Sequence, residues 1–137
     1  MKVKSYQTAI LRKLPSKPAR FLNELGLLKG KMLDYGCGYG LDAMLFHMDR
    51  FDPAFFPKRK FKGKYDIIVC IYVLNVVSTK EQNKIIINVK KLLRKGGKAY
   101  FAVRRDLKIK TKTQRIVKLN LSKLVENSSF CIYKLNQ

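Results

Sequence analysis

The stretch "LDYGCGYG", residues 33–40, packs three glycines into five positions directly after an apolar run. The chain has only eight glycines in 137 residues, so this concentration stands out. A buried strand that leads into a glycine turn and a helix brings backbone N–H groups and a positive helix end to one edge of a sheet. Gly36, Gly38 and Gly40 permit positive φ and the close approach of a ligand that a Cβ would block. We therefore predict a ligand site at this turn.

Strand and helix patterns alternate through the first hundred residues, which is typical of a doubly wound α/β domain. The predicted strands are residues 31–35, a brief strand that ends at Asp52, 65–73, 98–105, 113–121 and 130–136. A helix is expected to begin near Leu41, and the clearest helix starts at Ser78, with Gly96 and Gly97 as its stop. The sheet should be mostly parallel, with the last two strands forming an antiparallel edge.

The domain organisation follows from this order. We predict a single domain over residues 1–137, because a chain of this length is too short for two ordinary domains. It divides into a basic leader and N-terminal helix (1–30), a ligand-binding core (31–105) and a C-terminal strand pair (106–137).

The charge of the chain indicates a polyanionic partner. Thirty Lys and Arg against nine Asp and Glu give a net charge of +21, and a field of that sign attracts nucleic acid. A compositional bias toward lysine, isoleucine and asparagine is the alternative explanation. The segment "PKRKFKGK", residues 57–64, combines cations with Phe61, which suits a phosphate backbone with one stacked base. The candidate nucleic-acid contacts are Lys58, Arg59, Lys60, Lys62, Arg104 and Arg105.

Cysteine and histidine usage disfavours disulfides and a metal site. The three cysteines, Cys37, Cys70 and Cys131, are widely spaced, and only His47 is available to join them around a metal. The longest apolar runs fall short of the roughly 20 residues of a membrane helix, and the N-terminus lacks the pattern of a secretory signal. We expect no membrane association and a cytoplasmic location.

The glycine turn differs from the dinucleotide fingerprint. G-x-G-x-x-G requires glycine at its sixth place, where this chain has Leu41. Asp34, directly before the turn, suits a ligand with positive charge better than a pyrophosphate. Four of the nine acids, Asp34, Asp42, Asp49 and Asp52, fall around this turn. For Asp42 the alternative is a charge that stabilises the start of a helix, and Asp49 is expected to be exposed.

Four segments in order resemble class I S-adenosylmethionine-dependent methyltransferases. "MLDYGCGYG" (32–40) resembles the first motif of that family, and "RFDP" (50–53) the acidic residue that ends the second strand. "YDIIVCIYVLNVV" (65–77) resembles the fourth-strand motif, and "LLRKGGKAYFAV" (92–103) the turn and fifth strand that follow. The leader and "YVLNVV" further resemble small methyltransferases associated with DNA phosphorothioation systems.

This resemblance implies a Rossmann-like fold and S-adenosylmethionine as cofactor, with Asp52 on the ribose hydroxyls. The residues implied to hold the cofactor are Asp34, Gly36, Cys37, Gly38, Gly40, Asp52, Pro53, Cys70 and Ile71. For catalysis it points to Tyr72 and Asn75, just after the fourth strand of the family, although packing or capping roles explain both equally well. The "NPPY" and "DPPY" patterns for amine methylation of bases are absent, and so is a Pro-Cys pair for attack on a pyrimidine.

The chain is shorter than the family pattern between Gly40 and Asp66, so the third strand is expected to be missing. The cofactor pocket is then partly open, completed by a partner or a second copy, or no longer competent. Three hypotheses follow. The first is a methyltransferase that acts on RNA or DNA. The second is a catalytically silent module that binds nucleic acid or a partner protein, and the third is a methyltransferase for a small acidic molecule or a protein.

Overall fold

The computed structural model describes residues 13–57, 61, 63–106 and 117–137. The described strands form one six-stranded sheet in the order β2-β1-β3-β4-β6-β5. In chain order the elements are α1 (Lys17–Glu24), β1 (Met32–Tyr35), α2 (Leu41–Phe46), β2 (Asp49–Phe51), β3 (Tyr65–Ile71), a 3-10 turn (Leu74–Val76), α3 (Thr79–Leu92), β4 (Leu93–Arg104), β5 (Ser122–Glu126) and β6 (Phe130–Asn136).

The pairing confirms the predicted α/β sheet. Strands β2, β1, β3 and β4 run parallel, and β6 and β5 form an antiparallel edge. Between α2 and β3 the described chain contributes only the three-residue strand β2, which lies at the other edge of the sheet. The sheet is therefore shortened where the sequence predicts it. Strand β1 lies between β2 and β3, so the chain adds β2 on one side of β1 and β3 on the other. Open α/β sheets bind ligands at the carboxyl ends of the strands where the strand order changes direction in this way.

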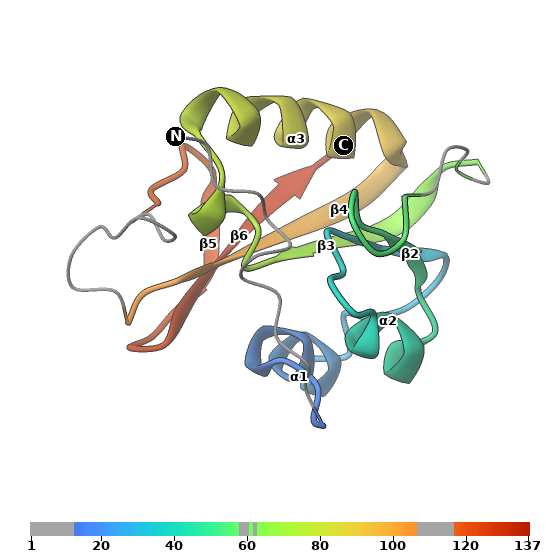
Figure 1. Cartoon of the computed structure of the whole chain (residues 1–137), viewed down its shortest axis with the longest axis horizontal. Helices are drawn as coiled ribbons and strands as arrows, with labels where there is room; N and C mark the ends of the chain where they lie inside the picture. Colours follow the sequence, from blue (N-terminus) through green and yellow to red (C-terminus); the bar gives the residue numbers. More distant parts are fainter. Residues whose placement is uncertain (1–12, 58–60, 62, 107–116) are drawn as a thin grey trace.

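Helices cover both faces of the sheet (Figure 1). Helix α3 lies on one face, and α1 and α2 lie on the other. Strand β3 explains why two layers are needed, because its residues are buried toward both faces: Ile68 and Cys70 join the core under α3, and Val69 and Ile71 join the core under α1. A strand that is apolar on both faces is typical of parallel sheets.

Local signals in the sequence explain where the two longer helices begin. Ser16 caps α1 by accepting a hydrogen bond from the N–H of Ala19, and Ser78 caps α3 by accepting from the N–H of Glu81. Each cap occupies one of the N–H groups that a helix leaves without a partner in its own first turn.

Two predicted boundaries are wrong. Helix α3 ends at Leu92, before Gly96 and Gly97, because the fully buried Leu93 turns into the sheet and pairs with Tyr65. The glycines instead lie in an irregular part of β4, where the pairing register with β3 shifts. The strand expected at 113–121 is displaced to Ser122–Glu126, and the described residues 117–121 are outside any strand. Residues 113–116 of that prediction lie outside the described part.

None of the helices in the described ranges combines the length and the apolar character required to cross a membrane.

Candidate cofactor site

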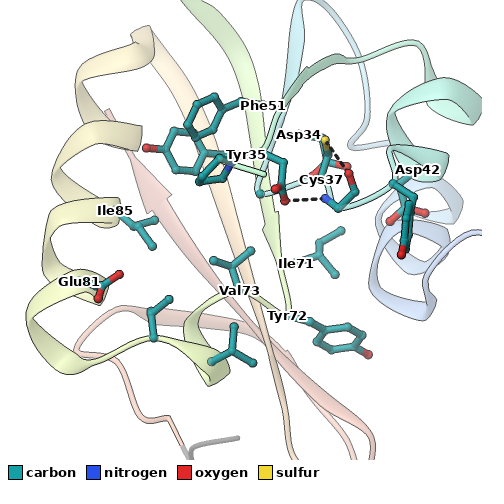
Figure 2. Close-up of a pocket in the computed structure, with 17 residues that line it drawn as sticks. Asp34, Tyr35, Cys37, Asp42, Phe51, Ile71, Tyr72, Val73, Glu81 and Ile85 are labelled. Carbon is teal, nitrogen blue, oxygen red and sulfur yellow. Dashed lines mark hydrogen bonds between the residues drawn. The ribbon is translucent and has the colours of Figure 1, made fainter. Parts of the chain in front are cut away.

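A cavity of about 250 Å³ opens at the carboxyl ends of β1, β2 and β3 (Figure 2). The glycine turn forms its centre, α3 contributes one wall, and Asp42 of α2 lies at the opposite side. Its lining residues are Asp34, Tyr35, Gly36, Cys37, Gly38, Tyr39, Asp42, Phe51, Asp52, Pro53, Ile71, Tyr72, Val73, Val76, Val77, Glu81 and Ile85. The ligand site predicted at this turn thus coincides with a real hollow in the protein.

The charge of this cavity is opposite to the charge of the chain. Four of the nine carboxylates line it, Asp34, Asp42, Asp52 and Glu81, and none of its described lining residues is Lys or Arg. In a chain with 30 basic residues this segregation creates a negative hollow within a positive surface. Since nearby carboxylates stabilise positive charge, the cavity favours a cationic ligand.

The glycine turn needs glycine for backbone and packing reasons. Gly36, Gly38 and Gly40 have φ of 86°, 58° and 85°, in the left-handed region that L-residues avoid. A Cβ at Gly36 would overlap the Val73 side chain, and one at Gly40 would lie 3.0 Å from the Phe56 ring. At these two positions the protein's own side chains occupy the space that we expected a ligand to use.

The turn uses most of its amides internally. The N–H groups of Gly36 and Cys37 both donate to the Phe51 carbonyl, at 2.7 and 2.9 Å, and that of Gly40 donates to the Cys37 carbonyl at 3.0 Å. The N–H of Gly38 donates to a carboxylate oxygen of Asp52 at 2.9 Å. The expectation that the backbone N–H groups of this turn serve a ligand is therefore wrong for Gly36, Cys37, Gly38 and Gly40. A turn whose donors are occupied is poorly suited to phosphate, which agrees with the carboxylates around the cavity.

Asp52 organises this turn as well as lining the cavity. Its Oδ2 accepts from Gly38, and its Oδ1 accepts from the N–H groups of Ala54 and Phe55 at 2.9 and 3.3 Å. Only 4% of the residue is exposed. Each carboxylate oxygen has two acceptor sites, so Oδ2 retains one toward a ligand. That Asp52 binds ribose hydroxyls remains a prediction, and the hydrogen bonds from the chain's own amides leave it fewer acceptor sites for them.

The structure brings most of the predicted cofactor residues together, with two exceptions. Asp34, Gly36, Cys37, Gly38, Asp52, Pro53 and Ile71 line the cavity. Gly40 does not line it and instead precedes the first residue of α2. Cys70 is 1% exposed and packs in the core under α3. Cys70 precedes the last residue of β3 and is covered by its neighbours in that core, so it does not line the cavity.

The thiols at this site are held in their neutral form. Burial raises the pKa of Cys37 to about 12, and the Asp34 and Asp52 carboxylates add to that effect. Burial also raises the pKa of Cys70, again with a contribution from Asp34. A thiol that stays protonated is a poor nucleophile, so neither cysteine is suited to covalent catalysis.

Tyr72 occupies a strained position at the edge of the cavity. Its φ is 61°, which is rare for a residue with a large side chain, and its N–H donates to the Ala102 carbonyl at 2.8 Å. The strand β3 ends one residue earlier, so the strain lies where the chain leaves the sheet. Strain of this kind concentrates at functional sites. The prediction that Tyr72 contacts the cofactor or acceptor keeps its structural basis.

Asn75 has the contacts of a packing residue, the alternative that the sequence left open beside a catalytic role. The residue is 0% exposed and does not line the cavity. Its side-chain oxygen accepts from the N–H of Arg104 at 2.9 Å, which fastens the segment after β3 to the end of β4. This contact joins residues 29 positions apart, so no local pattern in the sequence reveals it.

The predicted nucleic-acid residues are only partly described. Lys58, Arg59, Lys60 and Lys62 lie outside the described residues. Arg104 donates two hydrogen bonds to Asp106, at 2.9 and 2.8 Å, and Arg105 donates to the Asn127 carbonyl at 2.8 Å. Both arginines already have partners in the chain. Phe61 packs against Phe51 with ring centroids 5.5 Å apart, so the ring expected to stack on a base joins the edge of the core.

Sequence reasoning missed much of the cavity wall. Glu81 and Ile85 come from the first half of α3, and Val73, Val76 and Val77 come from the segment after β3. The available signal was the position of α3, because a helix that follows a parallel strand begins at the carboxyl edge of the sheet. Its first turn then faces the same edge as the glycine turn. Tyr35 and Phe51, with ring centroids 4.8 Å apart, complete the wall.

Comparison with known proteins agrees with this architecture. Residues 6–121 match the family described as a methyltransferase domain. The magnesium protoporphyrin IX methyltransferase (ChlM) of Synechocystis PCC 6803, solved with bound SAM, superposes with a TM-score of 0.58 and 14% identity, covering 88% of this chain and 76% of that one. The closer resemblance to phosphorothioation-associated methyltransferases is not supported by these comparisons.

Two further solved structures have lower TM-scores. The PKMT2 protein of Rickettsia typhi in complex with AdoHcy has 23% identity and a TM-score of 0.44, covering 55% of this chain. This chain spans about a fifth of that protein, 21% of its length. The glycopeptide N-methyltransferase MtfA, complexed with SAH, has 10% identity and a TM-score of 0.48, with 93% of this chain and 77% of that one covered. No curated protein sequence matches significantly.

The family match extends over most of the chain and includes the glycine turn, the acidic end of β2 and the strands β3 and β4 of the same sheet. The chain therefore belongs to the methyltransferase-domain family, and its fold is a shortened form of the Rossmann-like fold of class I S-adenosylmethionine-dependent methyltransferases.

Proposed function

We propose that this protein transfers a methyl group from S-adenosylmethionine to a nucleic acid. The cavity at the glycine turn is the observation that supports the cofactor. Four carboxylates line it, although the chain has a net charge of +21. The cofactor bears a positive sulfonium and an amino group, which suit such a site. Its nucleoside part suits the apolar and aromatic wall that includes Phe51, Ile71 and Ile85.

The remaining residues fit this cofactor by their chemistry. Asp34 is 3% exposed at the end of β1, where a buried carboxylate favours a cationic group nearby. Asp52 retains an acceptor site for a hydroxyl group. When bound, S-adenosylmethionine would supply an electrophilic methyl group and a leaving group that departs as a neutral thioether, and the proton of the methylated acceptor would pass to water.

The chain's own contribution is alignment and the exclusion of water. The backbone bonds of Gly36 and Cys37 to Phe51 lock the glycine turn onto β2, which fixes the position of the carboxylates. Val73, Val76 and Val77 cover the cavity on the side of the segment after β3. A preorganised site of this kind accelerates a displacement by holding both reactants in line.

The nucleic-acid part of the proposal rests on charge. An excess of 21 positive charges in 137 residues supplies a field that attracts a phosphate backbone. The negative cavity keeps those phosphates away from the cofactor pocket itself. The negative cavity therefore binds the cationic methyl donor, and the positive outer surface binds the anionic acceptor.

Calorimetry with S-adenosylmethionine and S-adenosylhomocysteine tests the cofactor part. We expect both to bind the wild-type protein, and Asp34→Asn to weaken the binding of S-adenosylmethionine at least tenfold. Asp49→Asn is the matched control, because it removes the same charge from an exposed residue that does not line the cavity. Equal affinities in the two variants would contradict the assignment of the pocket.

Transfer of a labelled methyl group into separate RNA, DNA and protein fractions tests the acceptor. Label in RNA or DNA is the expected result. Label confined to protein or to small molecules would overturn the nucleic-acid part and leave the cofactor part intact. If nucleic acid is the acceptor, raising salt from 50 to 200 mM should weaken its binding well beyond about threefold.

A specific observation favours a second candidate, the catalytically silent module. Both oxygens of Asp52 bind the chain's own amides, so the carboxylate implied to hold the ribose is already largely engaged. The same calorimetry separates the two functions. Absence of binding by correctly folded protein at high concentration leaves only the silent module.

A further inference from the structure

A second cavity of about 580 Å³ lies next to the first, on the side of α1. It is lined by Lys13, Leu14, Pro15, Ser16, Lys17, Arg20, Tyr72, Arg104, Asp106 and Ser129. Tyr72 lines both cavities, and no other described residue does. The strained residue at the end of β3 is thus the partition between them.

The two cavities have opposite charges. The second is lined by four cations and one carboxylate. Arg104 and Asp106 form a bidentate ion pair and largely cancel each other. Lys13, Lys17 and Arg20 remain, all of them exposed and therefore able to move toward a ligand. The first cavity is lined by four carboxylates, so positive and negative hollows meet at one tyrosine.

The wall between the cavities is also fixed by a hydrogen-bonded pair. Ser16, which lines the second cavity, donates from its backbone N–H and its hydroxyl to the two oxygens of Asp42, which lines the first. Both residues are buried. The segment that carries Lys17 and Arg20 is therefore attached to the cofactor site and not free to swing away from it.

We propose that the second cavity is the acceptor site and that it binds a phosphate group of the acceptor through Lys13, Lys17 and Arg20. The inference rests on the proposed methyl transfer, because only then must a donor and an acceptor meet at one point. Opposite charges keep the cationic donor and the anionic acceptor in separate hollows. The reacting atoms meet beside Tyr72, where the hollows adjoin.

The phosphate can belong to a nucleic-acid strand or to a small phosphorylated molecule. A charge-reversal pair distinguishes specific binding from general attraction. Lys17→Glu with Arg20→Glu reverses two charges of the second cavity. Lys84→Glu with Lys91→Glu makes the same change of net charge on exposed lysines of α3, outside both cavities. Both pairs lie on helical surfaces, and thermal unfolding verifies that each variant is folded.

The binding of a fluorescent 12-nucleotide single-stranded RNA and of adenosine 5′-monophosphate is measured for each protein at 50 mM salt. We expect the cavity pair to weaken at least one probe tenfold or more beyond the α3 pair. A selective loss of RNA binding identifies a strand as the source of the phosphate, and a selective loss confined to the mononucleotide identifies a small molecule. Equal weakening by the two pairs for both probes overturns the proposal.

Calorimetry with S-adenosylhomocysteine is carried out on the wild-type protein and the two double variants. It tests the proposed methyl transfer separately from the assignment of the second cavity. Cofactor affinity within about twofold of wild type in all of them is expected, because none of the changed residues lines the first cavity. If no protein binds the cofactor, the proposed function fails. If all bind it and neither probe discriminates between the pairs, only the assignment of the second cavity fails.

Discussion

Ser16 and Asp42, which are 26 positions apart in the chain, are joined by two hydrogen bonds of 2.8 and 2.6 Å. The same serine hydroxyl accepts from the N–H of Ala19 and so caps α1. Asp42 lies in the first turn of α2, where the helix dipole also stabilises its charge. One buried contact therefore connects the starts of two helices. The interpretation of Asp42 as a helix-start charge is correct but incomplete, since its oxygens mainly hold Ser16.

We expect Ser16→Ala to destabilise the protein more than Ser78→Ala. Ser78 caps α3 by accepting one hydrogen bond from the N–H of Glu81, and the loss of such a cap costs about 1 kcal/mol. Ser16→Ala loses a cap and also leaves a buried carboxylate oxygen without its hydroxyl donor, which costs about 1–3 kcal/mol more. Urea unfolding of the two variants measures the difference. In a double-mutant cycle with Asp42→Asn, additive effects would contradict this coupling.

Gly36→Ala should be severely destabilising, and Gly26→Ala only mildly. Both glycines have positive φ, of 86° and 72°, which costs an alanine roughly 1–2 kcal/mol. At Gly26 the new methyl group meets nothing within 4 Å, whereas at Gly36 it overlaps Val73. Thermal unfolding should show the larger loss for Gly36→Ala, with part of it recovered when Val73→Ala is added. Equal losses at the two positions would mean that the turn relaxes around the new methyl.

The positive φ at Tyr72 should make two substitutions that both remove the ring differ in stability. Asn tolerates φ near 61° because its side chain can hydrogen-bond locally, whereas β-branched Val does not. We expect Tyr72→Val to be less stable than Tyr72→Asn by about 1 kcal/mol or more. Chemical denaturation of the two variants measures this. Equal stabilities would indicate that the strain is relieved by a local shift at the end of β3.

Cys37 should react slowly with alkylating agents in the folded protein. Its pKa of about 12, against an ordinary value of 9.0, leaves about a thousandfold less thiolate at pH 8. Labelling with iodoacetamide followed by mass spectrometry, with the urea-unfolded chain as reference, measures the protection. Rapid labelling of the folded protein would contradict the assignment of Cys37 as a neutral packed thiol.

The same pKa predicts how stability depends on pH. The folded state keeps the Cys37 proton between about pH 9 and about pH 12, where the unfolded chain loses it. The free energy of unfolding should therefore fall as pH rises through this window. Cys37→Ala removes this contribution, so its stability relative to wild type should improve from about pH 8 to about pH 10 in urea unfolding. A constant difference between the two proteins over that range would argue against the raised pKa.

Helices and strands can be predicted from the sequence where the local pattern of apolar and capping residues agrees with the burial in the folded protein. Strand β3 is apolar on both faces, and α3 starts at a serine cap, so both are predictable from neighbouring residues. The end of α3 is not, because two glycines are a strong stop signal in the sequence. Burial of Leu93 and its pairing with Tyr65 end the helix earlier. Tertiary burial thus outweighs local propensity at that boundary.

Only those cavity residues that lie next to a predicted strand end can be predicted from the sequence. Asp34 and Asp52 lie where strands end, so their place at the carboxyl edge of the sheet can be inferred from the sequence. Glu81 reaches the same cavity from α3, which is remote in sequence from both of these strands, and only the packing of that helix reveals it. Asn75 shows the opposite case, because its place after β3 suggests a site residue while its long-range bond to Arg104 assigns it to the scaffold.

Strand β2 ends the sheet with only three residues, and two of them, Asp49 and Arg50, are exposed and charged. An unpaired strand edge invites another chain to add to it, and short length with charged side chains is how natural proteins discourage that addition. Because no further strand of the described chain covers this edge, the two charges discourage another chain from pairing with it. Replacing both charges with valine would leave this edge apolar, and the variant would be expected to aggregate through main-chain pairing, an effect added to the loss of the hydrogen bond that Asp49 accepts from the Tyr65 hydroxyl.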